Sequence, residues 1–291
     1  KNNTCIFLKD VYNKKYRLLR MILKERRHWK GTRVIKMRII SLNVNNFGGK
    51  CPKPLLDDYK IDDVINWNEW GNAVDEWRNR NKVNIFNNVN SIVDVICDYE
   101  VVFLHEVDTN CDSWDYLRKK MTEYEFEMPN GINEYKKGKK STSCAFVKKG
   151  IYYTCSNRNS FDGYNRNVEI QIEDIYLVGV HMNYKDDMWE SYYKLAKNIS
   201  GKKALIIGDL NVFDDGTERK EKIKSLMDSY GWEDVWIYQG EASETPTCDT
   251  EKRIDYVLAT KSFVAGGVRE IIINAIRRQG ISDHAAVVAL L

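Results

Sequence analysis

The chain has 291 residues, of which 43% are hydrophobic and 12% aromatic, enough to bury the core of one large α/β domain. No apolar run approaches the roughly 20 residues of a membrane-spanning helix, and the polar first residues predict no secretory signal. The seven cysteines are scattered and form no C-x-x-C pair, which argues against a zinc knuckle and a disulfide framework. Reduced thiols are typical of the cytoplasm, the predicted location.

Charge is unevenly distributed along the chain. Residues 1–36 carry 12 Lys or Arg and two acids, whereas residues 37–291 carry 40 acids and 33 basic residues. Tyr16–Trp29 shows the apolar spacing of a basic amphipathic helix. We predict a basic N-terminal extension, 1–36, followed by a single domain, 37–291. Such an extension suits nucleic acid or weak contact with an anionic surface, and it is equally typical of a solvated helix.

From residue 37 onward, short β-rich runs alternate with helical patterns. Strands are predicted at 37–44, 101–107, 143–149, 151–156, 168–173, 175–182, 203–211, 254–260, 269–276 and 285–291, and helices at 73–98, 113–123, 187–199 and 218–230. Hairpins are predicted around Glu173 and around Gly150. About ten strands of mixed direction exceed one flat sheet. The predicted fold class is therefore a four-layer α/β sandwich, with two mixed β-sheets packed face to face and helices on the outer faces.

Polar side chains gather where the predicted strands end or begin. Each alone has an ordinary explanation as a turn residue or helix cap, but together they predict one cleft. Carboxylate and amide oxygens suit Mg²⁺, and histidines suit proton transfer or phosphate contact. The chain has no P-loop, no G-x-G-x-x-G and no Ser or Cys nucleophile motif. This polar set favours metal-assisted attack of water on a phosphate ester. Its members are Asn43, Asn45, Glu106, His181, Asn183, Asp209, Asn211, Asp255, Asp283 and His284.

The segments that carry these residues resemble one known superfamily. "SLNVNN", "FLHEVD", "GVHMNY", "IIGDLNVF", "RIDYVL" and "ISDHAAV" resemble, in order, the motifs of the endonuclease/exonuclease/phosphatase superfamily. This is the fold of deoxyribonuclease I, exonuclease III and the neutral sphingomyelinases. The resemblance covers residues 37–291 and implies a phosphoester hydrolase that uses Mg²⁺, with Mn²⁺ as an alternative.

The resemblance also implies a role for each site residue. Glu106 would be the main metal ligand, with Asn45 and Asp283 near the same ion. Asp209 would orient or deprotonate the attacking water. His284 would contact the phosphate while Asp255 orients it. The remaining roles are substrate contact and support: Asn211 and His181 at the phosphate or leaving group, Arg166 and Asn183 at the substrate, and Asn43 in the hydrogen bonds that join the site.

Two positions depart from the family pattern. His105 stands where many members have Gln before the metal-binding Glu. The acid that supports the counterpart of His181 in deoxyribonuclease I has no equivalent in "KKGKKSTS". The resemblance therefore supports His284 more strongly than His181.

The substrate is not settled by the fold. The N-terminal extension, the Lys136–Lys140 loop and Arg158 with Arg166 favour DNA, whereas the acidic balance of residues 37–291 predicts weak nonspecific DNA binding. We predict a nuclease. The alternatives are a phosphatase or phosphodiesterase acting on a small molecule or lipid head group, and an inactive binding module. The complete polar set disfavours the last.

Overall fold

The computed structural model describes most of the chain from Met37 onward. The described residues are 37–49, 60–61, 64–65, 69, 72–73, 76, 84–109, 111–129, 142–155, 166–182, 186–212, 219–243, 245–265, 267–268, 270–274 and 280–291. The N-terminal extension and the Lys136–Lys140 loop lie outside them, so the domain boundary and the helix at Tyr16–Trp29 stay predictions. Within these ranges no helix has both the length and the apolar character needed to cross a bilayer.

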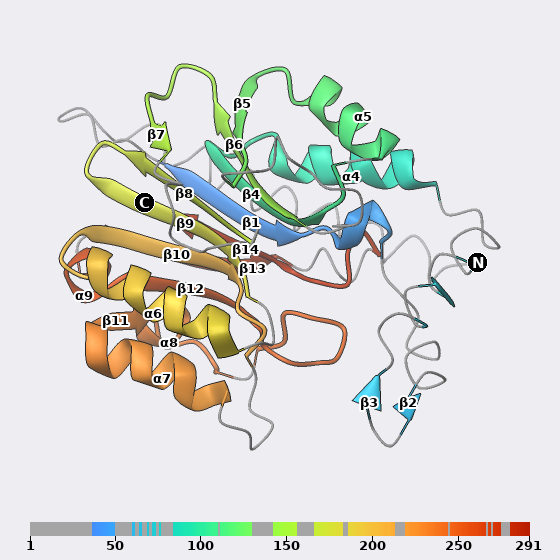
Figure 1. Cartoon of the computed structure of the whole chain (residues 1–291). Helices are drawn as coiled ribbons and strands as arrows, with labels where there is room; N and C mark the ends of the chain where they lie inside the picture. Colours follow the sequence, from blue (N-terminus) through green and yellow to red (C-terminus); the bar gives the residue numbers. More distant parts are fainter. Residues whose placement is uncertain are drawn as a thin grey trace, which may run out of the picture. The chain divides into compact units, whose positions relative to one another are not determined.

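Two six-stranded sheets of mixed direction form the centre of the fold (Figure 1). The first has the order β13-β14-β1-β4-β6-β5, with β1 parallel to β4 and the other neighbours antiparallel. Its strands are β1 (Arg38–Asn43), β4 (Val101–Val107), β5 (Tyr124–Glu127), β6 (Thr142–Lys148), β13 (Glu270–Asn274) and β14 (Ala286–Leu290).

The second sheet has the order β11-β12-β10-β9-β8-β7, with β9 parallel to β10 and the other neighbours antiparallel. Its strands are β7 (Thr154–Cys155), β8 (Asn167–Ile172), β9 (Ile175–His181), β10 (Lys203–Asp209), β11 (Trp232–Asp234) and β12 (Asp255–Thr260). A separate two-stranded hairpin joins β2 (Lys60–Ile61) to β3 (Val64–Ile65).

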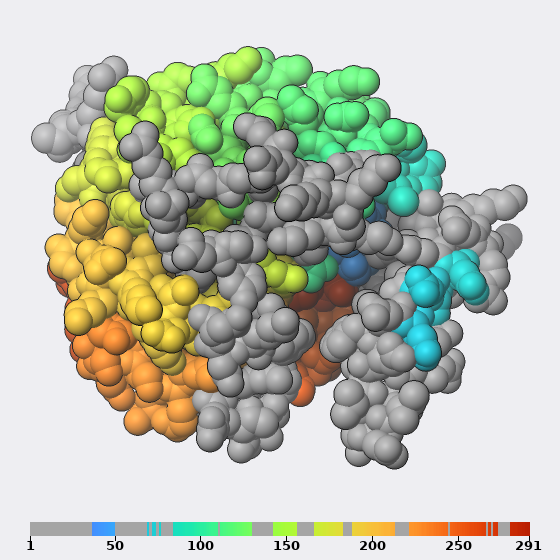
Figure 2. Space-filling model, in the orientation of Figure 1, coloured from blue at the N-terminus to red at the C-terminus, as the bar shows by residue number. Residues whose placement is uncertain are grey.

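Helices cover the outer face of each sheet, which confirms the predicted four-layer sandwich. The apolar sides of α4 (Ile85–Ile96) and α5 (Asp112–Lys120) pack on the first sheet. Those of α6 (Asp186–Ile199) and α7 (Arg219–Tyr230) pack on the second. In Figure 2 the surface over α5 and β5 is green, and the surface over α6 and α7 is yellow to orange. Three one-turn segments complete the described elements: η1 (Asn45–Phe47), α8 (Val235–Tyr238) and α9 (Lys261–Val264).

The strand faces that meet between the two sheets change from apolar to polar at one end. In β1 the inward side chains run from Ile39 through Ser41 to Asn43, because alternate residues of a strand share a face. β10 follows the same pattern, with Leu205 and Ile207 in the core and Asp209 at the end. The apolar part of the interface stabilises the sandwich by burial. The polar end forms the site described below.

Two details of the predicted strand pairing differ from the structure. The hairpin around Glu173 is confirmed, since β8 pairs with β9 through Ile172 and Ile175. The hairpin around Gly150 is wrong: β6 pairs with β4 and β5, whereas β7 pairs with β8 in the other sheet. The chain therefore passes from one sheet to the other after Gly150. The prediction failed because it missed β5, which occupies the position beside β6.

Candidate active site

Asp209 lies at the centre of the polar end of the sandwich. Its neighbour on β9 is His181 and its neighbour on β12 is Asp255. The Asp209 carboxylate accepts a hydrogen bond from Asn43 Nδ2 at 3.2 Å and from the backbone N–H of Asn211 at 2.8 Å. Asn43 belongs to the first sheet and Asp209 to the second, so this carboxylate joins the two sheets.

His284 is held by Asp255. Nδ1 of His284 lies 3.0 Å from Oδ2 of Asp255, and the carboxylate can only accept, so Nδ1 carries a proton. Burial by itself lowers the pKa of His284, but the charge and hydrogen bond of Asp255 raise the pKa well above its usual value. Nε2 of His284 lies 3.9 Å from Oδ2 of Asp209. The ring therefore presents a positive charge beside a second carboxylate.

The environment of Asp209 brings its titration close to neutral pH. Burial raises the pKa of Asp209 to about 7; the charge on His284 opposes this rise and the charge on Asp255 adds to it. A carboxylate with such a pKa can exchange a proton with water at physiological pH. This is the behaviour expected of a general base.

Glu106 reaches the cluster because β4 is irregular at its end. Regular alternation would turn Glu106 away from His105, toward the helices. Instead the register shifts between Leu104 and Val107, and Glu106 has a φ of 54°. Its Oε1 lies 3.4 Å from Nε2 of His181, and its side chain is 30% exposed. Burial raises the pKa of Glu106, and the charge on Asp283 raises the pKa further.

His181 is neutral and faces an arginine. Nη1 of Arg166 lies 3.0 Å from Nδ1 and 3.3 Å from Nε2 of the ring. A guanidinium only donates, so at the shorter contact Nδ1 is the acceptor and the ring proton is on Nε2, toward Glu106. Burial and the charge on Arg166 hold the pKa of His181 well below its usual value.

Asn45 and Asp283 flank the cluster on the first sheet. The side-chain amide of Asn45 donates to the carbonyl of Gly49 at 3.1 Å, so its oxygen is the atom that it could offer to a cation. Asp283 precedes His284 and is close enough to perturb the pKa of Glu106. Asn211 uses its amide to donate to the Met182 carbonyl at 2.7 Å.

Ten of the eleven predicted site residues thus lie in this cluster or at its edge. The eleventh, Asn183, lies outside the described residues. One candidate group of metal-binding atoms comes from Asp209, Asp255 and His284, whose atoms all lie within 4.8 Å of one another.

Sequence reasoning missed two residues that hold the site in place. The Thr247 hydroxyl accepts hydrogen bonds from the backbone N–H groups of Ile254 and Asp255, both at 3.0 Å. The Ser282 hydroxyl donates to the carbonyl of Asn43 at 2.6 Å and accepts from the N–H of His284 at 3.1 Å. Ser282 stands in the "SDH" segment, which could have indicated it; Thr247 carries no comparable sequence signal.

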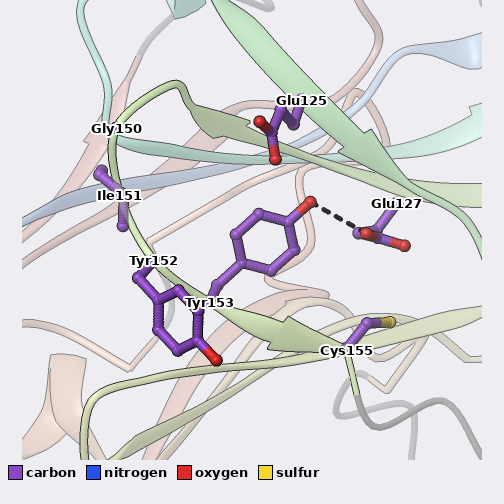
Figure 3. A pocket seen from close by; sticks show the side chains of 7 residues that line it. All are labelled: Glu125, Glu127, Gly150, Ile151, Tyr152, Tyr153 and Cys155. Carbon is purple, nitrogen blue, oxygen red and sulfur yellow. Dashed lines mark hydrogen bonds between the residues drawn. The ribbon is translucent and has the colours of Figure 1, made fainter.

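A cavity of about 550 Å³ lies away from this cluster. It is lined by Glu125 and Glu127 of β5 and by Gly150, Ile151, Tyr152, Tyr153 and Cys155. Figure 3 shows Tyr153 crossing it, with its hydroxyl donating to Oε1 of Glu127 at 2.9 Å. None of the residues in its lining belongs to the predicted site. The candidate active site is the polar end of the sandwich, because the predicted site residues meet there.

This fold and polar cluster define the class of hydrolytic phosphoesterases. The model of the Endonuclease/Exonuclease/phosphatase family matches residues 40–284, and the chain belongs to that family.

Many solved structures share this fold, among them the two that follow. AP endonuclease LMAP from Leishmania major superposes with a TM-score of 0.58 and 13% identity over 88% of this chain and 87% of that one. The 3′ phosphatase NExo from Neisseria, bound to a product DNA hairpin, superposes with a TM-score of 0.56 and 13% identity over 87% of this chain and 98% of that one. No curated protein matches the sequence.

Proposed function

We propose that this protein is a divalent-metal-dependent phosphodiesterase that cleaves nucleic acid, and that its substrate is DNA. The observation that carries the proposal is the arrangement of His284 between Asp255 and Asp209, at 3.0 Å and 3.9 Å. It places a fixed positive charge next to a carboxylate that titrates near neutral pH. A phosphodiester needs both, because its anionic centre repels an incoming hydroxide.

His284 and Arg166 supply positive charge to the phosphate. His284 donates from Nε2 to a non-bridging oxygen, while Asp255 keeps the proton on Nδ1. Arg166 contributes a second cationic donor from the side of His181. Asn43 orients Asp209, and Asn211 offers its remaining amide proton to a phosphate oxygen. Asn183 follows β9 in sequence and is assigned to the substrate from sequence alone.

Asp209 activates the attacking water. It takes one proton as the water oxygen forms a bond to phosphorus, and the bond from phosphorus to the leaving oxygen then breaks. The leaving oxygen departs with the bonding electron pair and takes a proton from solvent, and Asp209 returns its extra proton to solvent. Neutral His181 can donate a hydrogen bond from Nε2–H, but an imidazolium at this position is disfavoured by Arg166.

Glu106 and Asp283 would hold Mg²⁺ or Mn²⁺, together with the side-chain oxygen of Asn45. The residues fit a hard cation, because like charge from Asp283 and burial raise the pKa of Glu106, and a divalent ion would relieve both effects. The bound ion would supply Lewis-acid stabilisation of charge on the phosphate. The trio of Asp209, Asp255 and His284 suits a cation less well, because Asp255 already holds His284 in its charged form.

Two proteins of the same fold, an AP endonuclease and a phosphatase bound to a DNA hairpin, favour DNA over other phosphoesters as the substrate. The basic extension, residues 1–36, would add contacts to the phosphate backbone. A small phosphoester or lipid head group is the second candidate, since residues 37–291 carry more acids than basic residues. The cytoplasm stays the location predicted from the cysteine pattern.

The test is cleavage of supercoiled plasmid by the full chain with Mg²⁺, with an EDTA control. His284→Ala should lower nicking about 10²-fold or more, by the scale of lost transition-state donors. Asp228→Ala, a change on the exposed face of α7, is the matched control and should nick at the normal rate. If no nicking occurs while bis(4-nitrophenyl) phosphate or a lipid phosphodiester is hydrolysed, the substrate is the second candidate. If none is hydrolysed, the proposal is wrong.

A further inference from the structure

A buried polar chain lies between the sheets beneath the site and has no role in the mechanism above. It consists of Ser41 on β1, His105 on β4 and Ser143 on β6, with exposed fractions of 1%, 0% and 0%. Nε2 of His105 lies 2.9 Å from the Ser41 hydroxyl, and Nδ1 lies 2.8 Å from the Ser143 hydroxyl. Burying a polar group costs free energy unless it is hydrogen-bonded, so the presence of these three side chains in the core needs an explanation.

The direction of every hydrogen bond in this chain is determined. The Ser143 hydroxyl lies 2.9 Å from the carbonyl oxygen of Arg166, and only the hydroxyl can donate there. Ser143 has one proton, so it must accept from Nδ1–H of His105. A neutral ring with its proton on Nδ1 has an acceptor at Nε2, and Ser41 donates to it. One tautomer of His105 therefore satisfies all three bonds.

The series of hydrogen bonds through Ser41, His105 and Ser143 crosses from the first sheet to the second. Ser143 belongs to β6, whereas Arg166 immediately precedes β8 of the other sheet. The Arg166 carbonyl also accepts the backbone N–H of His181 at 2.7 Å. The last bond of the chain thus holds the residue whose guanidinium contacts the His181 ring.

His105 also touches the second sheet directly. A Cβ added at Gly208 would lie 2.8 Å from Nε2 of His105 and 2.1 Å from the Val180 carbonyl oxygen. Gly208 therefore allows the His105 ring to approach the backbone immediately before Asp209. The centroid of the His105 ring lies 6.3 Å from that of His181 on β9.

We propose that His105, in its Nδ1–H tautomer, is a positioning residue that sets the location of Arg166 and His181 relative to Glu106 through Ser143. The site draws Glu106 and Asn43 from one sheet and His181, Asp209 and Arg166 from the other, so the link between sheets controls their separation. The catalytic consequence rests on the proposed function, whereas the tautomer and the link do not.

Ser41→Ala and Ser143→Ala form a matched pair for testing the link. Each removes one buried hydroxyl from one side of the same ring, but only Ser143 connects to Arg166. We expect Ser143→Ala to lower kcat on the order of tenfold, as a small displacement of positioned groups does, with a smaller change in KM. Ser41→Ala should cost similar stability and much less kcat. Equal losses of kcat in the two variants would overturn the proposal.

A double-mutant cycle separates positioning from general damage. If Ser143 acts through Arg166, the loss caused by Ser143→Ala should largely disappear in an Arg166→Ala background, because interacting residues are not additive. Additive losses would show that Ser143 acts elsewhere. His105→Gln keeps one donor and one acceptor and should retain more kcat than His105→Leu. Equal activity of these two variants would also contradict the proposal.

The histidine tautomer can be read without any enzyme assay. A long-range ¹H–¹⁵N correlation spectrum of the full chain with ¹⁵N-histidine should show one ring in the Nδ1–H form, assigned by its loss in His105→Gln. Ser143→Ala should shift that signal more than Arg166→Ala does. An Nε2–H signal for His105 would overturn the proposal even in an active protein. The expected signal in a protein without phosphodiesterase activity would retain the link while the proposed function fails.

Discussion

Asp255 and His284 come from different sheets, and their contact closes the polar end of the sandwich. Asp255 begins β12 of the second sheet, and His284 lies just before β14 of the first. Oδ2 and Oδ1 of Asp255 lie 3.0 Å and 3.3 Å from Nδ1 of the ring. Thr247 fixes the Asp255 backbone and Ser282 fixes that of His284. Both partners are therefore held before substrate arrives, as preorganised catalysis requires.

Asp255→Asn should lower kcat by about 10²-fold or more while leaving the fold intact. The amide can keep the hydrogen bond, but it removes the charge that keeps His284 protonated and fixes its tautomer. We would measure hydrolysis of bis(4-nitrophenyl) phosphate with Mg²⁺ and compare far-UV circular dichroism. Asp228→Asn changes the same side chain on an exposed helix and serves as the control. Activity near the normal level in Asp255→Asn would remove this pair from the mechanism.

Mg²⁺ should raise the melting temperature of the full chain by about 5 °C at a hundredfold excess over Kd, because a ligand of the native state stabilises it. Glu106→Gln should abolish most of this shift, since it removes the carboxylate facing Asp283. Glu125→Gln, on the exposed part of β5, should keep the full shift. An equal shift in the Glu106 variant would place the cation elsewhere. The trio of Asp209, Asp255 and His284 would be the next candidate.

Much of the fold could be predicted because the core strands are strongly apolar. Runs such as "ALII" in β10 and "VVFL" in β4 have few alternatives to a buried strand. Besides the short hairpin of β2 and β3, the missed strands are β5, "YEFE", and β11, "WED", which are short and rich in acids. Their pairing is decided by neighbours distant in sequence, which a local pattern does not contain. For the same reason Gly150 was taken as a hairpin turn instead of a crossing between sheets.

The residues that the structure brings together in the candidate site could be named from the sequence, but their protonation and orientation could not. The position of Glu106 depends on an irregularity in β4 that contradicts simple alternation. The neutral state of His181 depends on burial and on Arg166, 15 residues away and adjacent only through the pairing of β8 with β9. The link from His105 to Arg166 joins two sheets. Each of these features arises from contacts between strands, which motif spacing does not specify.

Loss of His105 should change how folding stability depends on pH. Burial lowers the pKa of His105 from 6.5 to about 3, so between these values only the unfolded chain takes up the proton. The free energy of unfolding therefore falls as pH decreases from about 6.5 to about 3, and the contribution is complete above 6.5. Asp209 acts in the opposite direction, because its pKa is raised.

A comparison of variants separates the contribution of His105 to the pH dependence of stability from that of the other titrating groups. Relative to the parent chain, His105→Gln should flatten the stability curve by about 1.4 kcal/mol per pH unit between pH 6 and 4. Urea unfolding in EDTA at several pH values would measure this difference. Parallel curves for the two proteins would show that His105 does not remain neutral in the fold.

Gly208→Ala should destabilise the protein by about 3 kcal/mol or more, whereas Gly201→Ala should change stability little. Gly208 has a φ of 141°, and an added Cβ would meet the Val180 carbonyl oxygen and the His105 ring. Around Gly201 nothing lies within 4 Å of the added atom. Urea unfolding with intact metal-free protein would measure both variants. Equal stabilities would mean that β9, β10 and His105 can separate without cost, which would contradict the close packing that positions Asp209.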